Sequence, residues 1–359
     1  MITPIILSGG NGTRLWPMSR KAKPKQFIEL IDNETMFTQT IKRVSDKKYF
    51  TNPIVLGNIK HDYLIQKELK KNNIPTAEVV LEPKARNTAP AISAVIEYLY
   101  KENRRDEIVV FLPADAYIKD AKIFQDYLLE GVKLAQDNKV VCFGIRPLYP
   151  ETGYGYIKLD NKIENNSYLV EKFVEKPNFE TAQEYCNSSN YLWNAGIFMS
   201  KVSTLYNLFK KFQPELLEQI EITISKSKKE SNQLILDKDT FIQAKDISID
   251  YAIIENLDSS NLAVVSMNLT WSDLGSYASL FSVNLEKCGH NNITEGKTIL
   301  YNSSNNYIKA NKKIICCANV ENMVIVEEDD IILVMPISKS QDIKKLIDKI
   351  KEQDMDNIL

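Results

Sequence analysis

The first 145 residues alternate between short apolar runs and helical patterns, and this alternation restricts the fold more than any other feature. The runs are rich in β-branched residues, which is typical of strands buried on both faces of a parallel sheet. One helical pattern contains Phe37, Ile41 and Val44, and two more cover residues 92–99 and 124–132. The alternation predicts an open α/β sheet with ligands at the carboxyl ends of its strands. The predicted strands are residues 3–7, 53–57, 78–82, 108–112 and 140–144.

The rest of the chain divides into two further regions. Residues 151–285 mix strand-like runs with polar helices, and the Lys/Glu/Ser-rich residues 224–233 are expected to form an exposed helix end or loop. After Cys288, residues 297–336 contain five short strand patterns separated by polar turns. A helix is expected to follow at residues 338–353. We therefore predict one domain over residues 1–287 and a small β domain with a terminal helix over residues 288–359.

Composition excludes several classes of protein. Lys and Arg total 45 against 47 Asp and Glu, a formal net charge of -2. The chain therefore lacks the basic excess that is typical of nucleic-acid-binding proteins. The sequence contains no run of eighteen apolar residues, so it predicts no membrane span. The N-terminus lacks the basic region of a signal peptide, and the five cysteines show no CxxC spacing, so we expect a cytoplasmic protein with reduced thiols.

A glycine-rich segment, "LSGGNGTRLWPMSRKAKPKQF", follows the first predicted strand. It begins like the dinucleotide fingerprint, but Leu15 stands where the third glycine belongs, which weakens a nicotinamide or flavin interpretation. No Gly-Lys-Ser/Thr follows at P-loop spacing, and the catalytic-loop signature of protein kinases is absent from the sequence. Glycines allow consecutive backbone N–H groups to converge on an anion. Arg14 adds a planar fork for phosphate oxygens, and Lys25 adds a mobile point charge. The segment therefore predicts a polyphosphate site.

This segment resembles the opening motif of the sugar-1-phosphate nucleotidyltransferases, and within them of the mannose-1-phosphate guanylyltransferases. That motif reads G-G-x-G-x-R-L-W-P-x-S-R followed by P-K-Q-F, and each fixed position matches here. Further strings occur in the family's order: "EPKARNTAPAI", "LPADAYI", "TGYGYI", "FVEKP", "WNAGIFM", "SIDYAIIE" and "WSDLGSYASL". The resemblance implies a Rossmann-like α/β domain with a mixed, mostly parallel sheet, followed by a small β-helix-like domain.

The resemblance also implies a role for individual residues. The catalytic positions are Arg14, Lys25, Asp115 and Asp273, and the two aspartates are the implied ligands of Mg²⁺. The nucleotide-binding positions are Ser8, Gly9, Gly10, Gly12, Asn87, Thr88 and Ala114. The positions that bind the sugar phosphate are Tyr154, Gly155, Glu175, Lys176 and Asn194.

The reaction implied by the resemblance joins GTP and mannose 1-phosphate to give GDP-mannose and pyrophosphate. Two alternatives stay open at this point. The same chemistry could act on another sugar 1-phosphate of heptose, fucose or glucose type, or with another base. A non-catalytic homologue could instead sense nucleotide sugars, although such proteins lose charged site residues that this chain keeps. The family also makes a homodimer plausible.

Several of these residues also have purely structural interpretations. Asp115 and Asp273 could each cap a helix, and Asp250 is assigned to helix capping rather than to the site. Glu175 and Lys176 could form a surface pair. The three tryptophans are interpreted as core residues or pocket walls: Trp16, Trp193 and Trp271. The ordered occurrence of all the motifs favours the functional interpretation for the charged positions.

Overall fold

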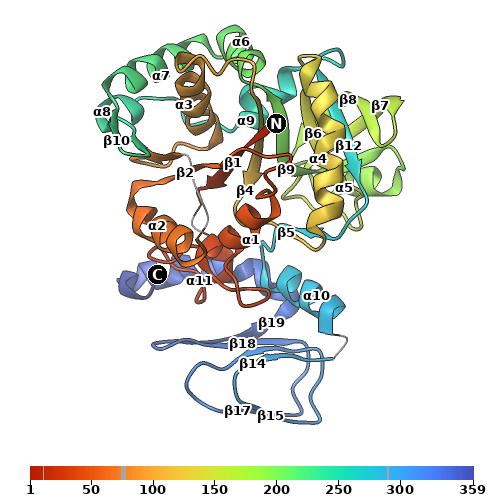
Figure 1. Cartoon of the computed structure of the whole chain (residues 1–359). Helices are drawn as coiled ribbons and strands as arrows, with labels where there is room; N and C mark the ends of the chain where they lie inside the picture. The colour runs from red at the N-terminus through yellow and green to blue at the C-terminus, as the bar shows by residue number, and fades with distance from the viewer. Residues whose placement is uncertain (11, 74–77, 289–290) are drawn as a thin grey trace. The chain divides into compact units, whose positions relative to one another are not determined.

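The computed structural model describes residues 1–10, 12–73, 78–288 and 291–359 (Figure 1). These residues form two compact units, each assembled from segments that lie far apart in the sequence. The first unit is Met1–Gly9, Thr40–Ala114 and Ile118–Trp271, and the second is Gly10–Gln39, Asp115–Tyr117 and Ser272–Leu359. The elements α1 (Met36–Arg43), β5 (Tyr117–Ile118) and β13 (Trp271–Ser272) contain points where the chain passes from one unit to the other.

The first unit is built on one sheet of eleven strands, in the order β10–β11–β3–β2–β1–β4–β9–β6–β12–β8–β7. Of these described strands, β8, β9 and β10 run against the other eight, so the sheet is mixed and mostly parallel. The strands are β1 (Ile2–Ser8), β2 (Ile54–Asn58), β3 (Glu78–Glu82), β4 (Ile108–Pro113), β6 (Val140–Ile145), β7 (Gly155–Glu164), β8 (Ser167–Glu175), β9 (Tyr191–Lys201), β10 (Lys228–Glu230), β11 (Gln233–Ile235) and β12 (Leu262–Met267).

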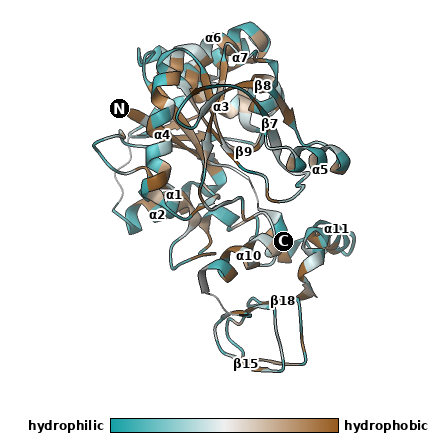
Figure 2. Ribbon diagram, turned by 90° about the vertical axis from the view of Figure 1, so that its right-hand side faces the viewer, coloured by the Kyte–Doolittle hydropathy of each residue, from teal (hydrophilic) through white to brown (hydrophobic). Residues whose placement is uncertain are grey.

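The five strands predicted from apolar runs are all present, as β1, β2, β3, β4 and β6. Nearly every residue in them is buried, as expected for strands covered on both faces. Figure 2 shows the strands of this sheet largely in the hydrophobic colour, whereas helices such as α4 carry both colours. Burial on two faces therefore explains why apolar runs located these strands within one or two residues.

Helices cover the sheet. Val109 and Phe111 of β4 belong to the core cluster that contains α3, α6 and α7, which pack against one another (Figure 1). On α4, a Cβ atom at Gly131 would lie 2.9 Å from the ring of Phe143 on β6, so this helix approaches its strand closely. The helices are α2 (Asp62–Lys71), α3 (Thr88–Lys101), α4 (Ala121–Gln136), α5 (Phe179–Asn187), α6 (Val202–Phe212), α7 (Pro214–Lys226), α8 (Lys238–Phe241) and α9 (Ile249–Ala252), with short 3₁₀ helices η3 (Ile59–His61) and η4 (Ile254–Asn256).

Two features of this unit differ from the sequence expectations. The helix α2 was not predicted, because only Ile65, Glu68 and Leu69 are buried and its lysine-rich surface hides the apolar period. Residues 224–233 are not simply a helix end or loop, since β10 lies inside this stretch and β11 begins in it. All three residues of β10 are exposed, and an edge strand of this kind carries charged residues that conceal strand character.

The second unit joins the N-terminal glycine segment to the C-terminal region around one core. Leu15 and Trp16 share a buried cluster with Tyr277, Ile343 and Ile347. The indole N–H of Trp16 donates to the Ile358 carbonyl at 2.8 Å, and the Tyr277 hydroxyl donates to the Leu15 carbonyl at 3.1 Å. Its helices are η1 (Thr13–Leu15), η2 (Lys25–Phe27), α10 (Tyr277–Cys288), η5 (Ile337–Asp342), α11 (Ile343–Glu352) and η6 (Asp356–Ile358).

The C-terminal strands of this unit wind as a parallel coil. Strands β14, β16 and β18 pair in parallel, β15 pairs in parallel with β17, and β19 returns antiparallel to β18. Gly296 stands at a corner with φ +79, where a Cβ atom would lie 2.0 Å from the Ala310 carbonyl oxygen. The strands are β14 (Ile293–Glu295), β15 (Thr298–Tyr301), β16 (Tyr307–Lys309), β17 (Ile315–Ala318), β18 (Met323–Glu327) and β19 (Ile332–Pro336).

These observations confirm the predicted fold class: a mixed, mostly parallel α/β sheet followed by a β-helix-like region. The five strands expected in residues 297–336 are present, and α11 lies within the predicted terminal helix. The domain boundary between residues 287 and 288 stays a prediction, because the two compact units do not divide at a single position. No described helix has the length and apolar character needed to cross a membrane.

Candidate active site

The four charged residues predicted for catalysis lie close together in the second unit. Lys25 is only 4% exposed, and its Nζ atom lies 3.0 Å from Asp115 Oδ2 and donates to the backbone carbonyl of Asp273. Arg14 completes the group, with a guanidinium nitrogen 3.8 Å from Asp273 Oδ2. We call these four residues the lysine cluster. The prediction of Lys25 as a mobile point charge is wrong, because η2 buries its alkyl chain and the two aspartates hold its ammonium group.

The loop after β13 holds the Asp273 carboxylate in place. Oδ1 of Asp273 accepts the Gly275 N–H at 2.9 Å, and the Leu274 N–H donates to Ser272 Oγ at 3.1 Å. Leu274 has φ 44, a left-handed conformation that is strained for a bulky residue. A Cβ atom at Gly275 would lie 2.2 Å from Asp273 Oδ2 and 3.0 Å from Arg14. The close approach of carboxylate and guanidinium therefore requires glycine at this position.

Helix capping does not explain Asp115. The N-cap of α4 is Asp120, whose carboxylate accepts the Ile123 N–H at 2.9 Å. The Asp115 side chain is 39% exposed and pairs with Lys25. Asp115 is thus available for a ligand and already faces a cation.

The lysine cluster has the donor chemistry of a divalent-metal site. Asp115 and Asp273 supply hard oxygen atoms, and the Lys25 ammonium already occupies a cation position between one carboxylate and one carbonyl. Within the described residues, no group of three or more His, Cys, Asp or Glu side chains gathers to hold a metal. A metal here would need further oxygen ligands from water or from phosphates, which is the usual situation for Mg²⁺. The residues present therefore fit such an ion.

The glycine turn connects the end of β1 to the lysine cluster. Gly10 and Gly12 have φ +90 and +56, so both need the freedom of glycine. A Cβ atom at Gly9 would meet no described atom within 4 Å, whereas one at Gly12 would lie 2.4 Å from Lys25 Cβ. Gly9 thus faces open space that a ligand could fill, and Gly12 allows the backbone to approach Lys25.

The predicted nucleotide segment begins α3 in the first unit. Asn87 has φ 63 and ψ -167, a region that is essentially restricted to glycine, and its side chain accepts the Thr88 N–H at 3.0 Å. The Thr88 hydroxyl accepts the Ile249 N–H at 2.8 Å and so ties this segment to α9. Just before it, burial raises the pKa of the Glu82 carboxyl to about 7, although a hydrogen bond with Asn58 opposes the shift. A strained backbone of this kind is typical of functional segments.

The residues predicted for the sugar phosphate also gather in the first unit. Lys176 Nζ lies 2.8 Å from Glu175 Oε1, and the Lys176 N–H donates to the Tyr154 carbonyl at 3.2 Å. A Cβ atom at Gly155 would lie 2.6 Å from Glu175 Oε2 and 3.3 Å from Asn194 Cβ. We call Tyr154, Gly155, Glu175, Lys176 and Asn194 the sugar-side cluster. Glu175 and Asn194 lie directly against Gly155, on β8 and β9, the two strands that pair with β7.

Charge and strain distinguish Lys176 within this cluster. Burial lowers the pKa of its ammonium group, but the hydrogen bond to Glu175 and the charge of that carboxylate outweigh burial, and the pKa is raised. The Lys176 side chain is 56% exposed, whereas that of Glu175 is 8% exposed. Lys176 has φ 47, and among the described residues only Lys176, Ser231 and Leu274 have positive φ without being Gly, Asn or Asp. Two of these three stand in the predicted motifs.

Aromatic rings form a wall beside the same cluster. The Tyr154 ring meets Trp193 and Trp271 edge to face, with centroids 5.3 and 5.4 Å apart. Trp193 is buried and Trp271 is partly buried. The tryptophans therefore have the packing role that the sequence indicated, as core residues and as neighbours of Tyr154.

The assignment of Asp250 to helix capping is wrong. Ser248 is the N-cap of α9, and its hydroxyl accepts the Tyr251 N–H at 3.3 Å. Asp250 Oδ1 instead accepts a hydrogen bond from Asn194 Nδ2 at 3.3 Å, which adds this carboxylate to the sugar-side cluster. The string "SIDYAIIE" contained a signal, because Ser248 is as good an N-cap as aspartate, so Asp250 is not needed as the cap and stands in the first turn of the helix.

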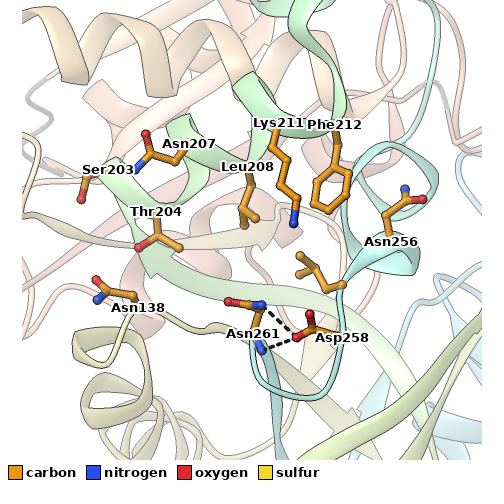
Figure 3. Close-up of a pocket in the computed structure, with 11 residues that line it drawn as sticks. Asn138, Ser203, Thr204, Asn207, Leu208, Lys211, Phe212, Asn256, Asp258 and Asn261 are labelled. Carbon is orange, nitrogen blue, oxygen red and sulfur yellow. Dashed lines mark hydrogen bonds between the residues drawn. The ribbon is translucent and has the colours of Figure 1, made fainter.

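A pocket of about 430 Å³ lies elsewhere in the first unit (Figure 3). Asn261 on its lining directly precedes β12, so the pocket is at the amino ends of the parallel strands. The carboxylate of Asp258 on its lining accepts Asn261 Nδ2 at 2.8 Å and the Asn261 N–H at 3.2 Å, so it serves its own loop. None of the residues predicted for the site lines this pocket.

Two family models match the chain. One, described as nucleotidyl transferase, matches residues 3–289, and the other, described as MannoseP isomerase/GMP-like beta-helix domain, matches residues 296–350. The chain therefore belongs to the nucleotidyl transferase family, and the resemblance drawn from the motifs is confirmed. Enzymes of this family generally use a divalent metal.

The similar proteins specify the class further. The chain is 36% identical over 355 residues to the mannose-1-phosphate guanylyltransferase of Escherichia coli, and the match covers 98% of this chain and 74% of that one. It is 37% identical over 350 residues to the xanthan biosynthesis protein XanB of Xanthomonas campestris pv. campestris, covering 98% and 73%. A solved structure from Thermus thermophilus, described as a mannose-1-phosphate geranyltransferase, has a TM-score of 0.85 and 26% identity, covering 98% and 99%.

Proposed function

We propose that this chain transfers the GMP group of GTP to mannose 1-phosphate, giving GDP-mannose and pyrophosphate. Family membership and the names of the relatives support this activity. The observation that carries the proposal is the lysine cluster, in which a nearly buried ammonium group is held against two aspartates. A cation fixed in this way suits chemistry on polyphosphates, because it needs no reorganisation when charge develops.

The chemistry requires positioning more than proton transfer. A phosphate oxygen of the sugar 1-phosphate attacks the α-phosphorus of GTP, the bond from that phosphorus to the bridging oxygen breaks, and pyrophosphate leaves with the electron pair. The attacking phosphate is already ionised at neutral pH, so no general base is needed. The barrier comes from bringing one anion to another, which the protein lowers by holding the reactants in line and offsetting their charge.

The residues of the second unit are assigned to the triphosphate. The backbone N–H groups of the glycine turn and the Arg14 guanidinium bind phosphate oxygens. Lys25 stabilises charge on the α-phosphate and on the leaving pyrophosphate. Asp115 and Asp273 would hold the divalent ion, for which we propose Mg²⁺, and that ion supplies charge neutralisation of the phosphates. Asn87 and Thr88, with Ser8 and Ala114, are assigned to the nucleoside side.

The sugar-side cluster is assigned to the second substrate. Lys176 binds the phosphate of the sugar, since its ammonium group is partly exposed and its raised pKa keeps it charged. Glu175 and Asn194 face the sugar hydroxyls. In this arrangement the Glu175 carboxylate exchanges its lysine partner for hydroxyl donors when substrate binds.

The proposal is tested by measuring pyrophosphate release from the full chain with a panel of sugar 1-phosphates against each of the four nucleoside triphosphates. We expect the highest kcat/KM with mannose 1-phosphate and GTP in the presence of Mg²⁺. A higher value with another sugar or base would establish the same chemistry on that substrate. Binding of nucleotide and sugar phosphate with no release of pyrophosphate would favour a sensor and overturn the enzymatic assignment.

Removing the Lys176 side chain is expected to weaken one substrate only. In Lys176→Ala, the KM for the sugar 1-phosphate should rise by about 10- to 100-fold, the usual effect of losing a hydrogen bond to a charged group, while the KM for GTP changes little. Steady-state kinetics with each substrate varied in turn provide the measurement. An equal rise in both KM values contradicts the assignment.

Two further variants separate charge from backbone effects at this position. Lys176→Gly removes the same charge but also relieves left-handed strain of about 1 kcal/mol, so its thermal midpoint should exceed that of the alanine variant by roughly 1–2 °C. Lys172→Ala removes an exposed lysine from β8, the strand that ends one residue before Lys176, and should leave both KM values unchanged. The homodimer and the cytoplasmic location stay predictions.

A further inference from the structure

Asp250 occupies a position that its own helix does not explain. The helix α9 has only four residues, its N-cap is Ser248, and the Asp250 carboxylate points instead to Asn194. Two hydrogen bonds fix the start of this helix against α3: the Ile249 N–H to Thr88 Oγ1 at 2.8 Å, and the Ala89 N–H to the Ile247 carbonyl at 3.1 Å. The position of Asp250 is therefore set by contacts on both sides, as expected for a residue that must be held in place.

The partner of Asp250 is oriented as well. Asn194 Oδ1 accepts the Gly196 N–H at 3.1 Å, so its amide nitrogen faces Asp250. Glu175 of β8 and Asn194 of β9 both lie next to β7, where a Cβ atom at Gly155 would lie 2.6 Å from the Glu175 carboxylate and 3.3 Å from Asn194 Cβ. Glu175 and Asn194 thus lie together beside Gly155, and the Asn194 amide joins the Asp250 carboxylate to them.

The charges of this group are not balanced. Burial and the charges of Glu175 and Glu255 together raise the pKa of Asp250 to about 7, against the opposing effects of a hydrogen bond from its own backbone N–H and of the charge of Lys176. Lys176 already pairs with Glu175 at 2.8 Å. Glu255 is engaged by the Glu175 backbone N–H at 2.9 Å, and the nearby Cys142 thiol has its pKa raised by burial and by Asp250. A half-buried carboxylate that lies near two other carboxylates is costly to the fold and is typical of a functional position.

We propose that Asp250 binds a hydroxyl group of the sugar 1-phosphate together with Asn194 and takes part in selecting the sugar. A hydroxyl can donate to the Asp250 carboxylate and accept from the Asn194 amide at the same time, which suits a pair spaced at 3.3 Å. Glu175 is placed to bind a neighbouring hydroxyl. This inference rests on the proposed function, because it names a residue for the sugar subsite of that reaction.

The test compares Asp250→Asn with Ser248→Ala. The first variant keeps the shape and removes the charged acceptor, and the second weakens the cap of the same helix but keeps the carboxylate. In Asp250→Asn, the KM for mannose 1-phosphate should rise by about 10- to 100-fold with little change in the KM for GTP. Ser248→Ala should keep the wild-type ratio of the two KM values.

Deoxy analogues of mannose 1-phosphate, lacking one hydroxyl at a time, identify the group that Asp250 binds. With the wild-type enzyme, kcat/KM for one analogue should fall below that for mannose 1-phosphate by about the same factor as the Asp250→Asn substitution causes. With the Asp250→Asn variant, kcat/KM for that analogue and for mannose 1-phosphate should be nearly equal, because the two changes remove the same interaction. Independent losses for every analogue, or an equal rise in both KM values, would overturn the inference while leaving the reaction intact. Absence of turnover by the wild-type chain on every sugar 1-phosphate would overturn the proposed function, and this inference with it.

Thermal unfolding of the same variants shows whether they fold. Because the folded-state pKa of Asp250 lies above that of an ordinary aspartate, its stabilising contribution is present at acidic pH and is lost as the pH rises through about 7. The difference in thermal midpoint between Asp250→Asn and wild type should therefore favour the variant more at pH 8 than at pH 5. Asp246→Asn, an exposed aspartate four residues earlier, should show no such difference. A lower thermal midpoint of Asp250→Asn relative to wild type at pH 8 than at pH 5 would contradict the inference that the ionised Asp250 carboxylate destabilises the fold.

Discussion

Replacing Asp115 or Asp273 by asparagine is expected to lower kcat for pyrophosphate release by about 10²- to 10³-fold, the usual effect of losing one fixed electrostatic contact to a transition state. Each substitution removes a carboxylate that fits a divalent ion, and Asp115→Asn also removes the charged partner 3.0 Å from Lys25. Asparagine keeps the size of the side chain and can still accept a hydrogen bond. The loss should therefore arise from charge rather than from packing.

The controls distinguish a damaged site from a damaged fold. Asp273→Asn should unfold within a few degrees of wild type, because Asp273 and its partner Arg14 have side chains that are 26% and 38% exposed, and such pairs contribute little to stability. Asp115→Asn takes a charged partner from Lys25, whose side chain is only 5% exposed, so its thermal midpoint should fall further while the chain still unfolds cooperatively. Asp348→Asn, at an exposed position on α11, should leave kcat unchanged. The variants should also require more divalent metal for half-maximal activity. Near-normal rates in both aspartate variants at ordinary metal concentration would end the assignment of these residues as metal ligands.

The strands could be predicted because their burial is local in the sequence. A strand covered on both faces must be apolar along its length, so β1, β2, β3, β4 and β6 were identifiable from single runs. The helix α2 and the edge strand β10 are mostly exposed, and exposed elements carry no comparable signal. The accuracy of the prediction thus followed the degree of burial.

The assembly of the second unit could not be predicted from the sequence pattern of any one segment. Leu15 and Trp16 read as part of a phosphate-binding motif, and only the structure shows that they share a core with α11. Hydrophobic patterns indicate that a residue is buried, but they do not identify the distant segment that buries it. The same limit applies to Lys25, whose ammonium group is bound by Asp115 and Asp273, residues 90 and 248 positions away.

The candidate site shows a related division. Family motifs located its charged residues, and the structure brings Arg14, Lys25, Asp115 and Asp273 together. Asp250 was missed because capping is a sufficient local explanation for an aspartate near a helix start, and only the hydrogen bond of Ser248 removes that explanation. The motifs therefore predicted which residues belong to the site. The structure was needed to show which of these side chains have a structural role and which can bind a ligand.

Substituting Gly12 by alanine is expected to damage both stability and catalysis. Gly12 has φ +56, and a Cβ atom there would lie 2.4 Å from Lys25 Cβ and 3.1 Å from the Lys25 backbone nitrogen. The left-handed conformation costs alanine about 1–2 kcal/mol, and the clash with the Lys25 backbone adds to this. Because Lys25 must move, its ammonium group leaves its position against Asp115. A displacement of about 1 Å at a reacting centre can lower the rate by about 10²-fold.

Gly9→Ala is the matched control for this prediction. Gly9 lies in the same turn, but its φ is not in the left-handed region, and a Cβ atom there would meet no described atom within 4 Å. Its thermal midpoint should equal that of wild type, and any loss should appear in the KM for GTP as the methyl group fills space assigned to phosphate. Gly12→Ala should instead lower the thermal midpoint without ligand and reduce kcat. If the two alanine variants behaved alike in both measurements, the contact between Gly12 and Lys25 would not be what positions the ammonium group.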